Sequence, residues 1–342
     1  MKKKMTQFGF TVPQLDQDLP TFERRTVPVP EPTGRQLLVE VKAVSVNPTD
    51  LATRAMKKEN DNSFTVLGRD VSGTVVASGP DSDLFKVGDD VFYPGSTNLE
   101  GTMADYHVVD ERMVAMKPRN LTHAEAAALP LTALTSYEVF HDRLSLFETG
   151  QKPEETTLLI VGASGGVGSI ASQIALNYGF RVIGTASRED SINHLKKMGL
   201  KHVINHKEAF KEQLEELGIE SVDAILLAAK ADDNSKEAGK VIKPQGRICS
   251  LLPLKQPLPM SYFGKSIQFS YELMYTRSVY ETPDWIKQHE YLTELKNQVE
   301  QGLIKTTLSK SYLEMNEDTI TDAFTALKTG HTIGKIVLNH SK

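Results

Sequence analysis

The sequence contains a single cysteine, Cys249, so no disulfide can form within the chain. A structural zinc site built from four cysteines is excluded for the same reason. No run of residues approaches the ~18 apolar residues of a membrane span, and no apolar run of ~7–15 residues follows the basic start MKKKMTQFGF to form a secretory signal. The net charge of −5 gives no basic excess of the kind that nucleic-acid-binding proteins use. We therefore expect a soluble, cytoplasmic protein that binds neither nucleic acid nor membrane.

The remaining composition is typical of a packed globular protein with room for two domains. Of the 342 residues, 39% are hydrophobic and 24% are charged, which are ordinary values for folded chains. Apolar residues at helical spacing predict helices at 285–299 and 320–327. β-Branched and alternating patterns predict strands near both ends of the chain. These strands are 36–46, 71–76, 91–93, 102–109 and 336–338.

The middle of the chain alternates predicted strands with predicted helices. Thr122 and Glu125 form a capping-box pattern that starts a helix at 124–129. Pro130 is expected to stop this helix, which resumes at 134–140. Strands that alternate with helices indicate a right-handed, doubly wound parallel sheet. The strands are 158–161, 181–185, 203–204, 222–227, 246–252 and, at an edge, 267–269; the helices are 170–176, 192–198 and 210–217.

These patterns predict an α/β protein in which one domain interrupts another. Residues 1–125 would form the first part of a β-rich catalytic domain. Residues 126–272 would form a parallel-sheet domain that binds a dinucleotide, and residues 273–342 would return to the catalytic domain.

The stretch ETTLLIVGASGGVG at 155–168 is the centre of the predicted dinucleotide-binding domain. A buried strand, a glycine turn and a helix form the setting in which a pyrophosphate lies on a helix N-terminus. The glycines fit GxGxxG with alanine in the first place, or the Gly-x-x-x-Gly-x-Gly spacing of short-chain dehydrogenases. Against the second, the motif begins far from the N-terminus, and none of the ten tyrosines has a lysine four places on. A tight turn without ligand is the alternative. The candidate cofactor residues are Ala163, Ser164, Gly165, Gly166, Val167 and Gly168.

The end of the second strand of such a domain indicates which cofactor is bound. An acid there pairs with the ribose hydroxyl of NAD, whereas an arginine takes the 2′-phosphate of NADP. The residues that follow Thr185 are Ala186, Ser187 and Arg188, with no acid at the strand end. We therefore predict NADPH, bound through Ser187 and Arg188. The alternative is a solvated loop arginine, and the adjacent Glu189 and Asp190 weaken the positive field.

Taken together, the motifs resemble those of the medium-chain dehydrogenases/reductases, in particular the zinc-free quinone oxidoreductase branch and its bacterial zinc-type alcohol dehydrogenase-like members. The resemblance covers nearly the whole chain. It implies a GroES-like catalytic domain and a Rossmann cofactor domain, with nicotinamide and substrate in the cleft between them. The motifs are VNPTD at 46–50, GRDVSG at 68–73, KVGDDV at 86–91, AAALPLT at 126–132, GGVG at 165–168 and GKIVL at 334–338.

The resemblance also implies that zinc is absent. Zinc-dependent members carry cysteine at the position of Asn47 and His-Glu at the positions of Arg69 and Asp70. Arginine stays protonated and cannot ligate a metal. We expect no metal site, and therefore no Lewis-acid route for alcohol oxidation.

Without zinc, hydride transfer needs an acceptor that is already electrophilic, such as a quinone or an α,β-unsaturated carbonyl. Asn47 could bind the carbonyl or the nicotinamide ribose, and Thr49 could relay a proton. Asp50 is expected to serve mainly as a hydrogen-bonding residue of the same turn, and the whole tetrad could be a plain Asx-turn. Tyr93 could line the cleft or could be a core tyrosine.

Further assignments come from the resemblance alone. Thr135 corresponds to a residue near the nicotinamide ring, Asn205 and His206 lie near the adenosine phosphate, and Lys335 matches a lysine of the last strand. Ser191 replaces a lysine that many quinone reductases use for the 2′-phosphate. The edge strand at 266–271 implies a homodimer.

Two other functions stay open. An enoyl-thioester reductase of the same superfamily uses a tyrosine in the region of Lys58, where this chain has none. A nucleotide-binding sensor or structural protein with little turnover is the third possibility.

Overall fold

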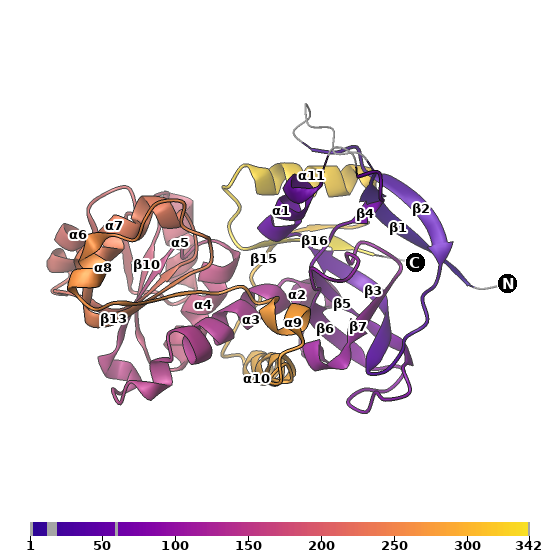
Figure 1. Cartoon of the computed structure of the whole chain (residues 1–342), viewed down its shortest axis with the longest axis horizontal. Coiled ribbons are helices and arrows are strands. Elements are labelled where there is room, and N and C mark those ends of the chain that lie inside the picture. The colour runs from indigo at the N-terminus through magenta and orange to yellow at the C-terminus, as the bar shows by residue number, and fades with distance from the viewer. Residues whose placement is uncertain (1–2, 12–18, 59–60, 341–342) are drawn as a thin grey trace. The chain divides into compact units, whose positions relative to one another are not determined.

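The computed structural model describes residues 3–11, 19–58 and 61–340, and it divides the chain into two compact units (Figure 1). Unit 1 comprises Met1–Leu131, Tyr275–Gly302 and Thr306–Lys342, and unit 2 comprises Thr132–Met274 and Leu303–Lys305. The predicted boundaries, after 125 and after 272, lie close to these divisions. The assignment of Leu303–Lys305 to unit 2 had no counterpart in the sequence-based prediction. Within the described ranges, no helix is long and apolar enough to cross a membrane.

Unit 1 is built on strands that pair antiparallel, except for β15 and β16, which pair in parallel, and it has one main apolar core. One sheet has the order β15-β16-β3-β5-β6-β8, with β7 also pairing with β3, and a smaller sheet has the order β2-β1-β4. The strands are β1 (Lys4–Phe10), β2 (Glu23–Pro28), β3 (Gln36–Ser45), β4 (Thr65–Val66), β5 (Asp70–Ser78), β6 (Asp90–Pro94), β7 (Tyr106–Asp110), β8 (Ala115–Met116), β15 (Leu308–Tyr312) and β16 (Lys335–Asn339). The helices are α1 (Pro48–Met56), η1 (Glu111–Met113), α2 (His123–Ala127), α9 (Thr276–Tyr280), α10 (Lys287–Glu300) and α11 (Glu317–Lys328).

The register of three strands brings polar residues to one place. Ser45 at the end of β3 pairs with Asp70 at the start of β5 and, on its other side, with Val337 of β16. Because neighbouring strands lie about 4.8 Å apart, the residues at these strand ends must be close in space. This arrangement positions the candidate catalytic residues of unit 1.

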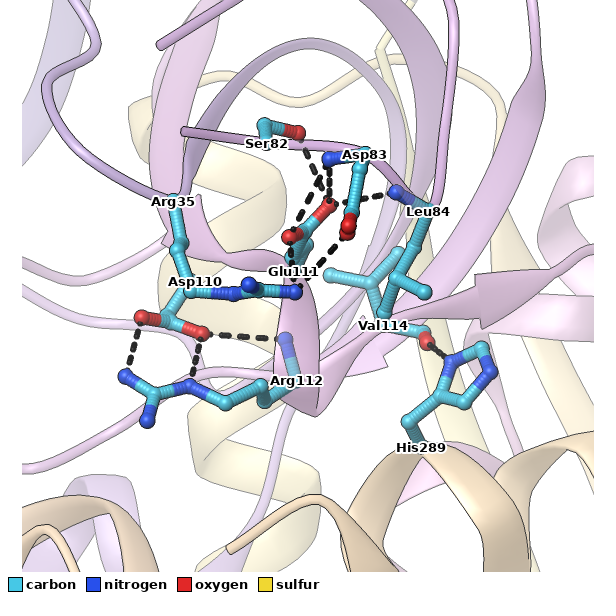
Figure 2. A network of polar contacts seen from close by, with 9 residues as sticks. All are labelled: Arg35, Ser82, Asp83, Leu84, Asp110, Glu111, Arg112, Val114 and His289. Carbon is cyan, nitrogen blue, oxygen red and sulfur yellow. Dashed lines mark hydrogen bonds and ion pairs between the residues drawn. The ribbon is translucent and has the colours of Figure 1, made fainter. Parts of the chain in front are cut away.

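A buried carboxylate anchors the loop between β5 and β6 (Figure 2). Glu111 is fully buried and accepts hydrogen bonds from Ser82 Oγ at 2.8 Å, Asp83 N at 3.1 Å and Leu84 N at 2.8 Å. It also forms an ion pair with Arg35 at 2.6 Å. Such a buried charge is tolerated because it is fully hydrogen-bonded and paired. The network is therefore structural.

Unit 2 confirms the predicted Rossmann arrangement. Its strands are all parallel, in the order β11-β10-β9-β12-β13-β14, which is the doubly wound order of dinucleotide-binding domains. The strands are β9 (Thr157–Val161), β10 (Arg181–Thr185), β11 (His202–Ile204), β12 (Val222–Leu227), β13 (Ile242–Ser250) and β14 (Gln268–Tyr271). The helices are α3 (Pro130–Glu138), which begins in unit 1, η2 (Val139–Arg143), η3 (Leu146–Glu148), η4 (Pro153–Glu155), α4 (Gly166–Asn177), α5 (Glu189–Lys197), α6 (Phe210–Glu216), α7 (Ala231–Val241) and α8 (Met260–Gly264).

The structure refines the local predictions in three places. The helix that begins at His123 ends before Pro130, as predicted, but the next helix starts at Pro130 itself and not at 134, because proline at the first helical position loses no hydrogen bond. The tetrad after Val46 is more than a turn, since Asn47 caps α1, whose first residue is Pro48. The polar helix α7 was not predicted because its apolar residues are mainly alanines and a glycine.

Candidate functional site

The glycine turn of unit 2 has the geometry that a pyrophosphate requires. After β9 the chain turns at Gly162, whose φ of +82° favours glycine. The turn is held by Gly162 N, which donates to Thr185 Oγ1 at 3.0 Å, and by Gly165 N, which donates to Gly162 O at 3.2 Å. A Cβ on Gly168 would lie only 2.3 Å from Gly162 O, so α4 packs against the turn as only glycine allows. The first N–H groups of a helix have no carbonyl partner within the helix, and such an end can bind a phosphate.

The other residues predicted for this turn have different exposures. Ala163 is fully buried beneath it, whereas Ser164, Gly165, Gly166 and Val167 are half-buried. The half-buried group is therefore the accessible part of the turn.

Positive charges gather where β10, β11 and β12 end. Burial, followed by the charges of Lys230, Lys207 and Arg188, lowers the pKa of His206. His206 Nδ1 is buried and has no hydrogen-bond partner among the described residues. Ser187 and Arg188 are half-buried at the start of α5. The predicted residues Arg188 and His206 thus lie in one neighbourhood, together with two lysines that sequence reasoning missed.

Asn205, another predicted cofactor residue, forms hydrogen bonds with its neighbours in the chain. Its Nδ2 donates to Glu208 Oε1 at 2.6 Å, and its Oδ1 accepts from Lys207 N at 3.0 Å. The structure therefore makes Asn205 a turn residue that shapes this edge. Thr135 is nearly buried in α3.

In unit 1, Asn47, Asp70 and Lys335 form a buried polar cluster. The Lys335 ammonium donates to Asp70 Oδ2 and to Val46 O, each at 3.1 Å, and to Asn47 Oδ1. Asn47 Nδ2 donates to Asp70 Oδ2 at 2.8 Å and approaches Ser45 O at 3.3 Å. An ammonium has three N–H groups, so these contacts use all the donors of Lys335. The structure therefore places Lys335 in a buried ion pair and leaves it no free donor for a cofactor.

Asp50 holds the same region from the other side. Its carboxylate accepts from Asn47 N and from Gly68 N, each at 2.8 Å. Burial raises the pKa of Asp50 to about 6, against the opposing effects of Arg69, these two N–H groups and Lys335. Because both oxygens serve the backbone, the expected structural role of Asp50 fits the geometry.

The hydroxyl of Thr49 contacts a residue outside the buried polar cluster. Its Oγ1 lies 3.2 Å from the hydroxyl of Tyr275, a residue far along the chain that only the fold brings close. Burial raises the pKa of Tyr275. Tyr93, by contrast, is fully buried in the core and its hydroxyl lies 3.1 Å from His107 Nδ1, which favours the core alternative over a cleft-lining role.

Arg69 differs from the other charged residues of the cluster. It is 3% exposed, yet its only side-chain hydrogen bond within the described part of the chain runs from Nη1 to Ser96 O at 3.0 Å. Its Nε is buried without a partner. Ser96, which accepts the hydrogen bond of Arg69, has its Oγ 2.8 Å from Ser278 Oγ, and Ser278 Oγ donates to Tyr275 O at 3.0 Å. Arg69 is thus connected through two serines to the residue that meets Thr49.

The residues present do not fit a zinc ion. Asp70 and Asn47 are both occupied by the Lys335 ammonium, and Arg69 carries a permanent positive charge. Among residues 3–11, 19–58 and 61–340, no group of three or more His, Cys, Asp or Glu side chains could hold a metal. The residues do fit a nicotinamide dinucleotide, on the evidence of the Gly168 cradle and the orphaned His206 nitrogen.

Comparisons with known proteins show the family to which the two units belong. Residues 33–119 match the family model of the alcohol dehydrogenase GroES-like domain, and residues 166–287 match that of the zinc-binding dehydrogenases. The chain is 38% identical to a zinc-type alcohol dehydrogenase-like protein of Staphylococcus epidermidis over 93% of this chain and 94% of the relative. It is 29% identical to a 2-methylene-furan-3-one reductase of Solanum lycopersicum over 92% of this chain and 74% of that protein.

The fold is also similar to a solved structure. A protein from Rhizobium etli, described as a candidate zinc-dependent alcohol dehydrogenase, superposes with a TM-score of 0.93 at 37% identity and covers 100% of both chains.

Proposed function

The chain belongs to the medium-chain dehydrogenase/reductase superfamily, and on that premise we propose that it reduces α,β-unsaturated carbonyls or quinones with NADPH, without zinc. The observation that carries this proposal is the Lys335 ammonium between Asn47 Oδ1 and Asp70 Oδ2. A cation of the chain itself is thus bound where zinc-dependent members of the superfamily have metal ligands. Without a Lewis acid, a conjugated acceptor is the substrate class that remains reactive toward hydride. The enone reductase activity named for the tomato relative supports this choice.

NADPH supplies the hydride when it is bound. The glycine turn at 162–168 would hold its pyrophosphate, and Arg188, Lys207 and Lys230 would surround its 2′-phosphate together with His206. A phosphate dianion beside these groups gains charge-assisted hydrogen bonds and relieves the orphaned His206 nitrogen. The same cations give the hydroxyl group of NADH no comparable attraction.

Thr49 is the side chain of the tetrad best placed to move a proton. Among the described residues, its hydroxyl is paired only with that of Tyr275, and two linked hydroxyls can pass a proton to an oxygen of the reduced acceptor. Asn47 acts as a positioning residue, because its amide is used by Asp70 and Lys335. The start of α1, and with it Thr49, is fixed by these contacts.

Purified protein should oxidise NADPH in the presence of neutral enones or quinones, with a kcat/KM for NADPH well above that for NADH. Arg188→Ala should reduce the preference for NADPH, whereas Lys152→Ala, at an exposed position that precedes β9, should not. Consumption only with an enoyl thioester would favour the alternative reductase. Nucleotide binding without consumption across the panel would favour a sensor or structural protein.

We also propose a homodimer formed through β14. This strand lies at the edge of the parallel sheet, and its Tyr271 is 51% exposed. An unpaired sheet edge can accept the same strand of a second copy across a two-fold axis. Light scattering should give twice the chain mass. Tyr271→Pro should give the monomer, because Glu272 N donates to Ser250 O of β13 and the N–H of the preceding residue therefore faces the open edge.

A further inference from the structure

Among the described residues of unit 1, Arg69 is the buried charged side chain that makes the fewest hydrogen bonds. Arg277 is comparably buried, at 5% exposed, but its Nε and Nη2 donate to Asp284 Oδ2 at 3.1 and 2.8 Å. Arg69 has only the Ser96 carbonyl, and no carboxylate of the described residues lies within ion-pair distance of it. A buried guanidinium with an orphaned N–H is unfavourable for folding. We therefore expect a bound ligand to accept the hydrogen bond that the folded chain does not provide.

The neighbours of Arg69 do not supply this partner. The Lys335 and Asp70 charges neutralise each other, and the Asp50 carboxylate is held by two backbone N–H groups. His107 is neutral near pH 7, because burial lowers its pKa to about 4. Tyr275 offers a hydroxyl, and that hydroxyl lies against Thr49. The neighbourhood thus combines a positive charge with hydroxyl donors, which is the arrangement that stabilises an oxyanion.

Resting on the function proposed above, we propose that Arg69 binds the carbonyl oxygen of the acceptor and stabilises the negative charge that this oxygen gains during hydride transfer. Arg69 then provides, through charge and hydrogen bonds, the stabilisation that a zinc ion would otherwise provide. Arginine is suited to this role because its planar fork presents several N–H groups and stays protonated.

The electrons and atoms of the step balance. Hydride reaches the β-carbon of the enone with its electron pair and forms a C–H bond. The electron pair of the C=C bond moves to join the α-carbon to the carbonyl carbon, and the carbonyl π pair moves onto oxygen, which gives an enolate held by Arg69. The linked hydroxyls of Thr49 and Tyr275 then pass a proton from solvent to this oxygen, which gives an enol. In solvent the enol loses this O–H proton and gains one on the α-carbon, so the carbonyl re-forms. The acceptor gains two electrons, NADPH becomes NADP⁺, and Arg69 keeps its proton throughout.

The first test compares Arg69→Met with Arg277→Met, measured with a neutral enone and with an enone that carries a carboxylate. We expect Arg69→Met to lower kcat/KM for both acceptors by roughly 100- to 1,000-fold, with Arg69→Lys in between. Its Tm should stay within about 2 °C of the wild type or rise, since an unpaired buried charge is lost. Arg277→Met should lower Tm, because it leaves Asp284 unpaired, and should lower kcat/KM much less.

A second test needs no turnover. With saturating NADP⁺, wild-type protein should bind para-nitrophenol as the coloured phenolate at a pH where the free compound is largely protonated. Arg69→Met should bind it at least about tenfold more weakly. Equal phenolate binding by the two proteins, or unchanged kcat/KM for the neutral enone, would overturn the proposal. So would a loss confined to KM for the carboxylate-bearing enone, because Arg69 would then be a docking site for a carboxylate.

The two proposals fail in different ways. If wild-type protein consumes no NADPH with any acceptor, the proposed function is wrong, and the phenolate titration still decides whether Arg69 binds an oxyanion. If wild-type protein is active and Arg69→Met is equally active, the function stands and the role of Arg69 is wrong.

Discussion

The ammonium of Lys335 lies 3.1 Å from Oδ2 of Asp70, and the two side chains are 4% and 0% exposed. Asp70 also accepts Leu131 N at 2.7 Å through its other carboxylate oxygen. The pair therefore links the starts of β5 and β16 to the start of α3 within unit 1. It is a buried ion pair, so removal of either residue would leave the other charge buried without a counter-ion.

Removing one member of this pair should destabilise unit 1 strongly. Lys335→Met leaves the Asp70 carboxylate buried without its counter-ion, which should lower the free energy of unfolding by about 3–5 kcal/mol. Lys211→Met is the matched control, because its pair with Glu215 has side chains 59% and 54% exposed and should change stability by at most about 0.5 kcal/mol. Urea unfolding of both variants measures the difference. Equal effects would mean that the buried pair contributes no more than a surface pair.

Substitutions at two glycines of the cofactor turn should have different effects on stability and on NADPH binding. Gly168→Ala would place a Cβ 2.3 and 2.5 Å from backbone atoms of Gly162 and Ala163, so we expect a loss of about 1–3 kcal/mol of stability and weaker NADPH binding. At Gly165 the φ is −74° and the nearest atom would be 3.5 Å from the added Cβ. Gly165→Ala should therefore fold normally and lose affinity for NADPH only. Thermal melts and nucleotide titrations test this, and a stable, tightly binding Gly168→Ala would contradict it.

The preference for NADPH should depend on pH through His206. Burial and three neighbouring cations lower the pKa of His206 in the free protein. A bound 2′-phosphate opposes those cations and raises that pKa again, so binding takes up a proton. The NADPH/NADH affinity ratio should therefore rise as pH falls from about 8 to about 6.5. Calorimetry in buffers of different ionisation enthalpy would detect the proton, and His206→Gln should abolish its uptake.

His107 should make the protein less stable in acid. Burial lowers its pKa from 6.5 to about 4 in the folded state, so the unfolded chain binds more protons between these values and stability is lost as pH falls through that range. The Asp50 pKa, raised from 3.8 to about 6, acts with the opposite sign. The contribution of His107 is therefore isolated by comparison with His107→Gln, against which wild-type stability should decline by up to about 3 kcal/mol from pH 6.5 to pH 4. Parallel pH profiles would contradict this assignment.

Local signals predicted the elements that have strong periodicity or a defined cap. The bounds of β10 and β12 agree with the predictions, and the capping box at Thr122 forms as expected. The parallel-sheet order also follows from the alternation of strands and helices. These features depend on residues near one another in sequence, so one chain is sufficient to predict them.

The candidate site was harder to predict because it depends on distant segments. Tyr275 meets Thr49 from the far end of the chain, and no local pattern marks such a contact. Lys335 was predicted as a cofactor residue, and only the register of β16 against β3 shows its pairing with Asp70. Lys230 could have been found, because it closely follows β12 at the edge where parallel strands of such domains bind ligands. Arg69 was noted only as a residue that cannot bind zinc, since its missing partner is visible in three dimensions alone.

The central claim is that this chain transfers hydride to a conjugated acceptor without a metal. The most direct measurement incubates chelator-treated protein with an enone and NADPH deuterated at its hydride-donating carbon, and locates the deuterium in the product by mass spectrometry and NMR. We expect undiminished turnover, with deuterium on the β-carbon of the saturated product. Turnover that disappears on chelation and returns with added zinc would contradict the account.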